Sequence, residues 1–97
     1  MFLKVHRSPG AGDVVAVCDS ELLNTTIGDG EIDVHITESF YGNRHASEKE
    51  VREALAHAGN ANLMGERTVA LAIDMGLVTR SGCIMINNVP HALIFRM

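Results

Sequence analysis

Asn60-Ala-Asn-Leu-Met-Gly-Glu-Arg-Thr-Val-Ala-Leu-Ala-Ile-Asp-Met-Gly-Leu-Val78 is the stretch that decides the fold. It predicts a helix from Asn60, whose side chain can cap the first turn, to Gly76, which can adopt the left-handed conformation after the last turn. At about 100° per residue, small and apolar residues share one stripe of this helix: Ala61, Met64, Gly65, Thr68, Leu71, Ala72 and Met75, widened by Val69 and Ile73. A helix this apolar must be covered on most sides, so we expect it at the centre of the core.

The composition is that of one globular domain, which we expect to span residues 1–97. Of the 97 residues, 46% are hydrophobic and 21% are charged, and no apolar run is long enough to cross a bilayer. The first residues show no signal-peptide pattern. The two cysteines, Cys18 and Cys83, fit neither a disulfide scaffold nor a zinc motif. We therefore expect a cytoplasmic protein with no membrane partner.

The net charge of −4 is unevenly distributed. Residues 1–45 carry three cationic side chains against seven carboxylates, whereas residues 46–97 carry five of each. Sequence-independent binding to nucleic acid depends on clustered Lys and Arg, and no such cluster occurs along the chain. We therefore predict no sequence-independent nucleic-acid binding and interpret the acidic excess as a solvated surface.

The other periodicities predict an α+β domain. Alternation and apolar runs indicate five strands and two further helices: strands at 2–7, 14–18, 31–37, 83–86 and 89–96, and helices at 20–25 and 47–58. Ser47 and Glu50 have the spacing of a capping box, which supports the second of these helices. Gly59 ends it immediately before the Asn60 helix, so the two would form an αα-hairpin. The order β-β-α-β-α-α-β-β predicts a mixed β-sheet with this αα-hairpin packed on one face.

Several short segments together resemble one known family. They are Phe2-Leu-Lys-Val5, Val17-Cys-Asp19 with Glu21-Leu-Leu23, Phe40-Tyr-Gly42, Ala61-Asn-Leu-Met-Gly-Glu-Arg67 and Val89-Pro-His-Ala92. In their order and spacing the chain resembles a small archaeal protein family of unknown function, domain of unknown function 424. The resemblance implies an archaeal cytoplasmic protein with a loose association with the translation apparatus. It implies no activity and no catalytic residues.

Residues that often carry chemistry occur here without their usual motifs. There is no Walker loop, dinucleotide-binding glycine turn, His-Glu-x-x-His or Cys-x-x-Cys. The five histidines lie on different predicted elements, so we expect no metal site and no cofactor. Cys18 ends an apolar strand beside Asp19, whose charge disfavours a thiolate, so we interpret this cysteine as a buried hydrophobic residue. Asp19 itself is placed to cap the short helix at 20–25.

One polar cluster is the candidate ligand- or partner-binding site, formed by Asn62, Glu66, Asn88 and His91. Asn62 falls on the apolar side of the predicted helix, and Glu66 follows one turn later. Gly65 between them leaves room for another backbone, which the segment holding Asn88 and His91 could supply. Two interpretations stay open: a structural network that pairs buried polar groups, or a functional site.

The sequence leads to three functional hypotheses. The first is a small non-enzymatic binding or adaptor module, associated with RNA–protein (translation) complexes through a protein or ribonucleoprotein partner. The second is a small enzyme with an acid/base site around Glu66 and His91. The third is a homo-oligomer that pairs an edge strand. We favour the first because the chain is short and has no catalytic motif.

Overall fold

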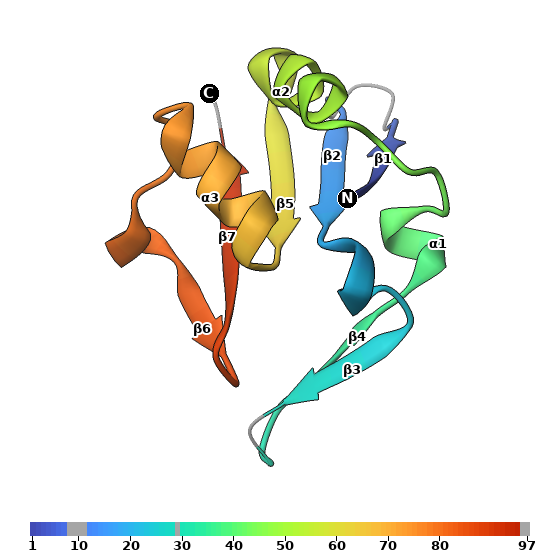
Figure 1. Ribbon diagram of the computed structural model, residues 1–97, viewed down its shortest axis with the longest axis vertical. Coiled ribbons are helices and arrows are strands. Elements are labelled where there is room, and N and C mark those ends of the chain that lie inside the picture. The colour runs from blue at the N-terminus through green and yellow to red at the C-terminus, as the bar shows by residue number, and fades with distance from the viewer. Residues whose placement is uncertain (8–11, 29, 96–97) are drawn as a thin grey trace.

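The computed structural model describes residues 1–7, 12–28 and 30–95. Its larger sheet has five strands in the order β1-β2-β5-β7-β6. These are β1 (Phe2–His6), β2 (Val14–Cys18), β5 (Asn60–Met64), β7 (Val89–Phe95) and β6 (Ile84–Ile86). β2 and β5 run parallel, and the other neighbouring pairs are antiparallel. The sheet is therefore mixed, and the predicted α+β class with a single compact domain is confirmed (Figure 1).

The two longest helices cover one face of this sheet. They are α2 (Glu48–His57) and α3 (Glu66–Asp74), and both lie in front of the sheet in Figure 1. Because strand side chains alternate between faces, Val15 and Val17 of β2 and Ala61 and Leu63 of β5 face the helices. Together with apolar side chains of both helices they form the main core. Within the described residues, no helix is long and apolar enough to cross a membrane.

A second apolar cluster lies on the opposite face. It packs α1 (Glu38–Tyr41) and a separate hairpin of β3 (Thr25–Gly28) and β4 (Asp33–Ile36) against the sheet. The fully buried members on the sheet side are Ala16, Cys18 and Met64. The hairpin extends from the lower end of the sheet in Figure 1. Two single 3-10 turns, Ser20–Leu22 and Arg80–Gly82, complete the described elements.

The predicted helix start at Asn60 is wrong, because Asn60–Met64 is the central strand β5. Gly65 follows with a φ of 110°, and α3 begins only at Glu66. The predicted αα-hairpin is therefore corrected: β5 lies between α2 and α3. The physical reason is that five residues here gain ladder hydrogen bonds on both sides, to β2 and to β7, and tertiary pairing of this kind overrides local propensity.

Other local predictions have mixed outcomes. The helix end is confirmed, since Gly76 has a φ of 74° and the following N–H returns to the last turn. The capping box at the start of α2 is confirmed as well. The predicted helix at 20–25 shrinks to a single 3-10 turn, without a side-chain cap from Asp19. The segment after Thr37, which lies outside the predicted strands and helices, contains the one-turn helix α1. The predicted strand at 31–37 is shorter in the structure, where β4 spans Asp33–Ile36 and Ile32 is 65% exposed.

Candidate functional site

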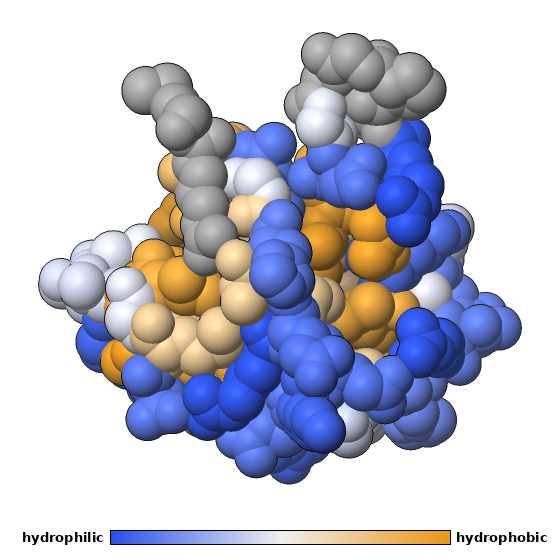
Figure 2. Space-filling model, turned by 90° about the horizontal axis from the view of Figure 1, so that it is seen from above, coloured by the Kyte–Doolittle hydropathy of each residue, from blue (hydrophilic) through white to orange (hydrophobic). Residues whose placement is uncertain are grey.

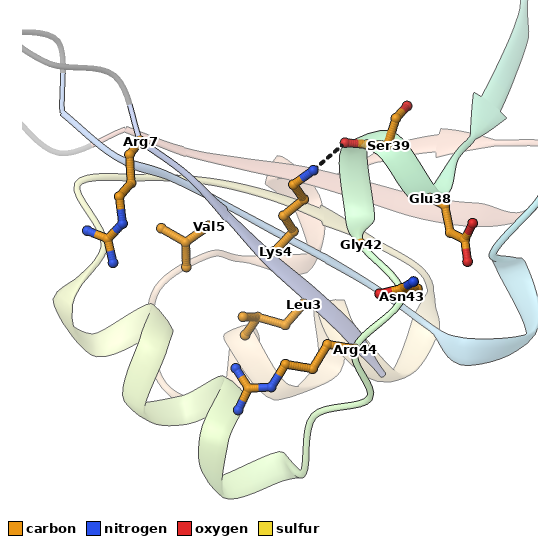
Figure 3. Close-up of a pocket in the computed structure, with 9 residues that line it drawn as sticks. All are labelled: Leu3, Lys4, Val5, Arg7, Glu38, Ser39, Gly42, Asn43 and Arg44. Atoms are coloured by element: carbon orange, nitrogen blue, oxygen red, sulfur yellow. Dashed lines mark hydrogen bonds between the residues drawn. The ribbon is translucent and has the colours of Figure 1, made fainter.

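An open depression of about 780 Å³ lies along the outer edge of β1 (Figure 3). We call it the edge pocket; it is lined by Leu3, Lys4, Val5, Arg7, Glu38, Ser39, Gly42, Asn43 and Arg44. Lys4, Arg7 and Arg44 are the only cationic side chains among the first 45 residues, and folding brings all three to this depression. Three cations that are dispersed along the sequence therefore line one depression with a single carboxylate, Glu38, on the surface of an acidic protein.

Contacts between β1 and the end of α1 fix the floor of the edge pocket. Lys4 Nζ donates a hydrogen bond of 3.0 Å to the Ser39 carbonyl oxygen (Figure 3). Gly42 has a φ of 77°, and a Cβ there would lie 3.1 Å from Lys4 Cβ and 3.2 Å from the Leu3 carbonyl oxygen. Only glycine combines this backbone conformation with so close an approach. The segment after α1 therefore runs directly along the edge of β1.

Within the part of the chain that the structure describes, the side chains of the two arginines of the edge pocket are held by exposed ion pairs. Arg7 Nη1 lies 3.3 Å from Asp13 Oδ2, and Arg44 Nη2 lies 2.6 Å from Glu50 Oε2. Pairs of this kind contribute little to stability because water solvates both partners and screens them. Either guanidinium group can therefore exchange its carboxylate for that of a ligand at little cost in stability.

Two of the four predicted site residues, Asn62 and His91, meet on the sheet face opposite the helices. Asn62 Oδ1 accepts hydrogen bonds from the Tyr41 hydroxyl at 2.8 Å and from His91 Nε2 at 3.3 Å. Burial raises the pKa of Tyr41 and lowers the pKa of His91, so both side chains are neutral at pH 7. The contacts are those of a satisfied polar network in largely apolar surroundings.

Glu66 and Asn88, the other two predicted residues, lie apart from that network. Both line a small cavity of about 130 Å³ at the start of α3. The exposed Glu66 carboxylate accepts a hydrogen bond of 2.9 Å from Arg80. No hydrogen bond or ion pair among the described residues joins Glu66 to His91, whose ring bonds to Asn62. The structure thus joins Asn62 to His91 by a hydrogen bond and places Glu66 and Asn88 at one small cavity, whereas the proposed acid and base have different hydrogen-bond partners.

Asp19 has a role that the sequence did not reveal, because it caps α3. The residue is 2% exposed. Oδ1 accepts from Thr68 N and from Thr68 Oγ1, both at 2.8 Å, and Oδ2 accepts from Arg67 N at 3.0 Å. A Cβ on Gly65 would overlap this carboxylate. The expected backbone approach at Gly65 also occurs, since its N–H donates to the Pro90 carbonyl oxygen at 2.9 Å.

The thiol of Cys18 has low reactivity in this environment. Its side chain is fully buried, and burial, with a smaller contribution from the charge of Asp19, raises the pKa of the thiol to about 11. A thiol of this kind is a poor nucleophile at neutral pH, because the thiolate is the reactive form. In the part of the chain that the structure describes, no three His, Cys, Asp or Glu side chains group in a way that could hold a metal ion.

A mixed five-stranded sheet, covered by two helices on one face and by a hairpin with a short helix on the other, defines a small α+β protein. The chain belongs to the family described as protein of unknown function (DUF424), whose model matches residues 6–97. Among solved structures it is similar to an uncharacterized conserved protein from Methanopyrus kandleri. That protein is 26% identical, with a TM-score of 0.78 over 99% of this chain and 92% of the other. No curated protein matches the chain. The family resemblance is confirmed, and the comparisons assign no activity.

Proposed function

We propose that this protein is a small non-enzymatic binding or adaptor module, and that the edge pocket is its partner-binding surface. The observation that carries the proposal is the convergence of Lys4, Arg7 and Arg44 on one open depression in a chain of net charge −4. Opposite charges across an interface steer association and select partners. A segment rich in Asp or Glu therefore fits this surface.

The partner that fits best is a protein. Binding to a nucleic-acid backbone needs several cations aligned along it, and the rest of this acidic chain would repel a phosphate backbone. The family resemblance suggests where such a partner would act, namely in an RNA–protein complex of the translation apparatus in the archaeal cytoplasm. In that setting the module would contact a protein component.

The enzyme hypothesis has less support from the geometry. An acid and a base must both lie within reach of one substrate. Glu66 is paired with Arg80, and His91 is bonded to Asn62 on the sheet face opposite the helices. Among the described residues the two side chains therefore have different hydrogen-bond partners and share none, so we favour binding over catalysis.

Selection from a display library of short random peptides tests the proposal. Peptides that bind the protein should be enriched in Asp and Glu, and the Arg7→Glu and Arg44→Glu variants should lose them. Arg52→Glu is the matched control, because it makes the same charge change at an exposed ion pair of α2, outside the edge pocket. Selected peptides without acidic residues, or equal losses in all three variants, would contradict the proposal.

A further inference from the structure

The two edge strands of the five-stranded sheet differ in charge. β1 and β6 lie at opposite ends of the strand order (Figure 1). β1 carries Lys4, and Arg7 directly follows it. β6 has no charged residue, since it consists of Ile84, Met85 and Ile86. Figure 2 shows hydrophilic residues along the right rim of the molecule, the side of β1, and mainly apolar and neutral residues on the left, the side of β6. Charged side chains discourage an edge strand from pairing with another chain, so β1 is protected in this way and β6 is not.

The backbone of Met85 points out of the sheet at the β6 edge. Met85 lies opposite Pro90 of β7, and proline has no N–H to donate, so this is a non-hydrogen-bonded pair of the antiparallel ladder. The neighbouring pair of Ile86 with Val89 closes the two-residue loop at 87–88 and carries the hydrogen bonds. The N–H and C=O of Met85 therefore face away from β7. Among the described residues, no loop or side chain supplies a hydrogen bond to either group.

Exposed apolar side chains flank this open edge on both faces of the sheet. Ile84 is 59% exposed and Met85 is 54% exposed. Ile84 shares a face with Ile86, which packs in the apolar cluster opposite the helices, and the alternation along the strand places Met85 on the helix face. A partner docked on one face of the sheet would cover only one of the two exposed side chains. A strand added in the plane of the sheet would contact both, because its own side chains alternate in the same way.

A second copy of the chain fits this edge because β6 is complementary to itself. In an antiparallel pair related by a two-fold axis at Met85, the N–H and C=O of this residue meet those of the same residue in the other copy. Ile84 then lies opposite Ile86 of the second copy, so that apolar side chains meet and no like charges oppose each other. Arg80, the charged residue closest to β6 along the chain, is already paired with Glu66.

We propose that the protein self-associates through β6, which pairs antiparallel with β6 of a second copy to form one continuous sheet. The contact is small, since β6 has three residues, and small interfaces are weak and transient. The dimer therefore forms in a concentration-dependent manner. Because β1 lies at the opposite edge of the sheet, pairing leaves the edge pocket of each copy free, and the dimer presents two of them. The inference does not depend on the function proposed above.

Sedimentation velocity over a range of protein concentrations tests the surface. Met85→Lys places like charges opposite each other in the paired strands and should weaken association by at least about ten-fold. The matched control is Ile32→Lys, which makes the same kind of change at a residue that is 65% exposed between β3 and β4, away from the sheet edge. This control variant should associate as the parent protein does.

Two further measurements test the register of the pairing. Met85→Glu should also weaken association when studied alone, but an equimolar mixture of the Met85→Lys and Met85→Glu variants should associate again, because opposite charges then face each other across the two-fold axis. In the parent protein, amide hydrogen exchange measured by NMR should slow at Met85 as the protein concentration rises. The Ile84 amide should change little, because the alternation turns it toward β7.

The outcomes separate this inference from the proposed function. A parent protein that stays monomeric at every concentration would overturn the inference and leave intact the binding module, which needs only one edge pocket. Association that Met85→Lys leaves unchanged, or that both lysine substitutions weaken equally, would show that another surface is the contact and would also overturn it. So would a mixture of the two Met85 variants that fails to associate, or exchange at Met85 that is independent of concentration. Dimers that bind no acidic peptide would overturn the proposed function alone.

Discussion

Replacement of Asp19 by Ala should destabilise the protein more than most single substitutions. The carboxylate accepts three hydrogen bonds from the first turn of α3, and Thr68 is fully buried, so water cannot replace the lost acceptor there. An unsatisfied buried donor costs about 1–3 kcal/mol, and loss of a helix cap costs about 0.5–2 kcal/mol. Because Thr68 loses an acceptor for both its N–H and its hydroxyl, we expect a total of about 3–5 kcal/mol.

Urea unfolding followed by circular dichroism measures this loss. Asp19→Asn keeps one oxygen acceptor and should cost about half as much. Glu21→Gln is the matched control, because Glu21 pairs with Arg67 on the exposed surface and should change stability by about 0.5 kcal/mol or less. A double-mutant cycle of Asp19→Ala with Thr68→Val should show coupling of at least about 0.5 kcal/mol. A loss below about 1 kcal/mol for Asp19→Ala, or additive effects in the cycle, would refute the cap.

Three further predictions follow from burial. Leu71 is 5% exposed, so Leu71→Ala should cost about 2–5 kcal/mol in denaturant unfolding; a loss below about 1 kcal/mol would contradict its place in the core. At pH 8 a thiol reagent should modify the half-buried Cys83 well before Cys18, whose thiol has a pKa of about 11; mass spectrometry of the first adduct decides this. Burial lowers the pKa of His91, so the unfolded state binds its proton more tightly. The contribution of His91 to stability should therefore be complete above the ordinary pKa of about 6.5 and be lost as the pH falls through the lowered pKa, and His91→Asn should flatten the pH dependence of the urea midpoint.

The sequence predicted the class of the fold because most elements carry a clear pattern. The alternation in β1 and the apolar run of β2 each identify a strand, and the capping box identifies the start of α2. β5 was missed although its first four residues, Asn60-Ala-Asn-Leu63, alternate polar and apolar. Five residues are too few to separate a period of 2 from a period of 3.6, and the helix that follows extends the helical pattern backward.

The candidate site was only partly accessible to sequence reasoning. The contact between Asn62 and His91 follows from the pairing of β5 with β7, which required knowing that Asn60–Met64 is a strand. The link from Asp19 to α3 spans 49 residues at its longest, so no local pattern contains it. The only local sign was that Gly65, which directly precedes α3, cannot cap a helix through its side chain, so the cap had to come from a distant residue.

The edge pocket illustrates why linear charge patterns miss surface clusters. Lys4 lies within β1 and Arg7 directly follows its last residue. Arg44 belongs to the segment that runs antiparallel to the start of β1. Charged side chains along an edge strand, Lys above all, discourage pairing with another copy, and in the function proposed above the same cations bind an acidic segment. Neutralising them should therefore have two opposite effects. A Lys4→Thr, Arg7→Thr double variant should lose affinity for the acidic peptides that the protein selects and should gain concentration-dependent self-association in sedimentation velocity. A variant that lost the peptides but self-associated no more than the parent protein would mean that the cations select a partner without protecting the edge.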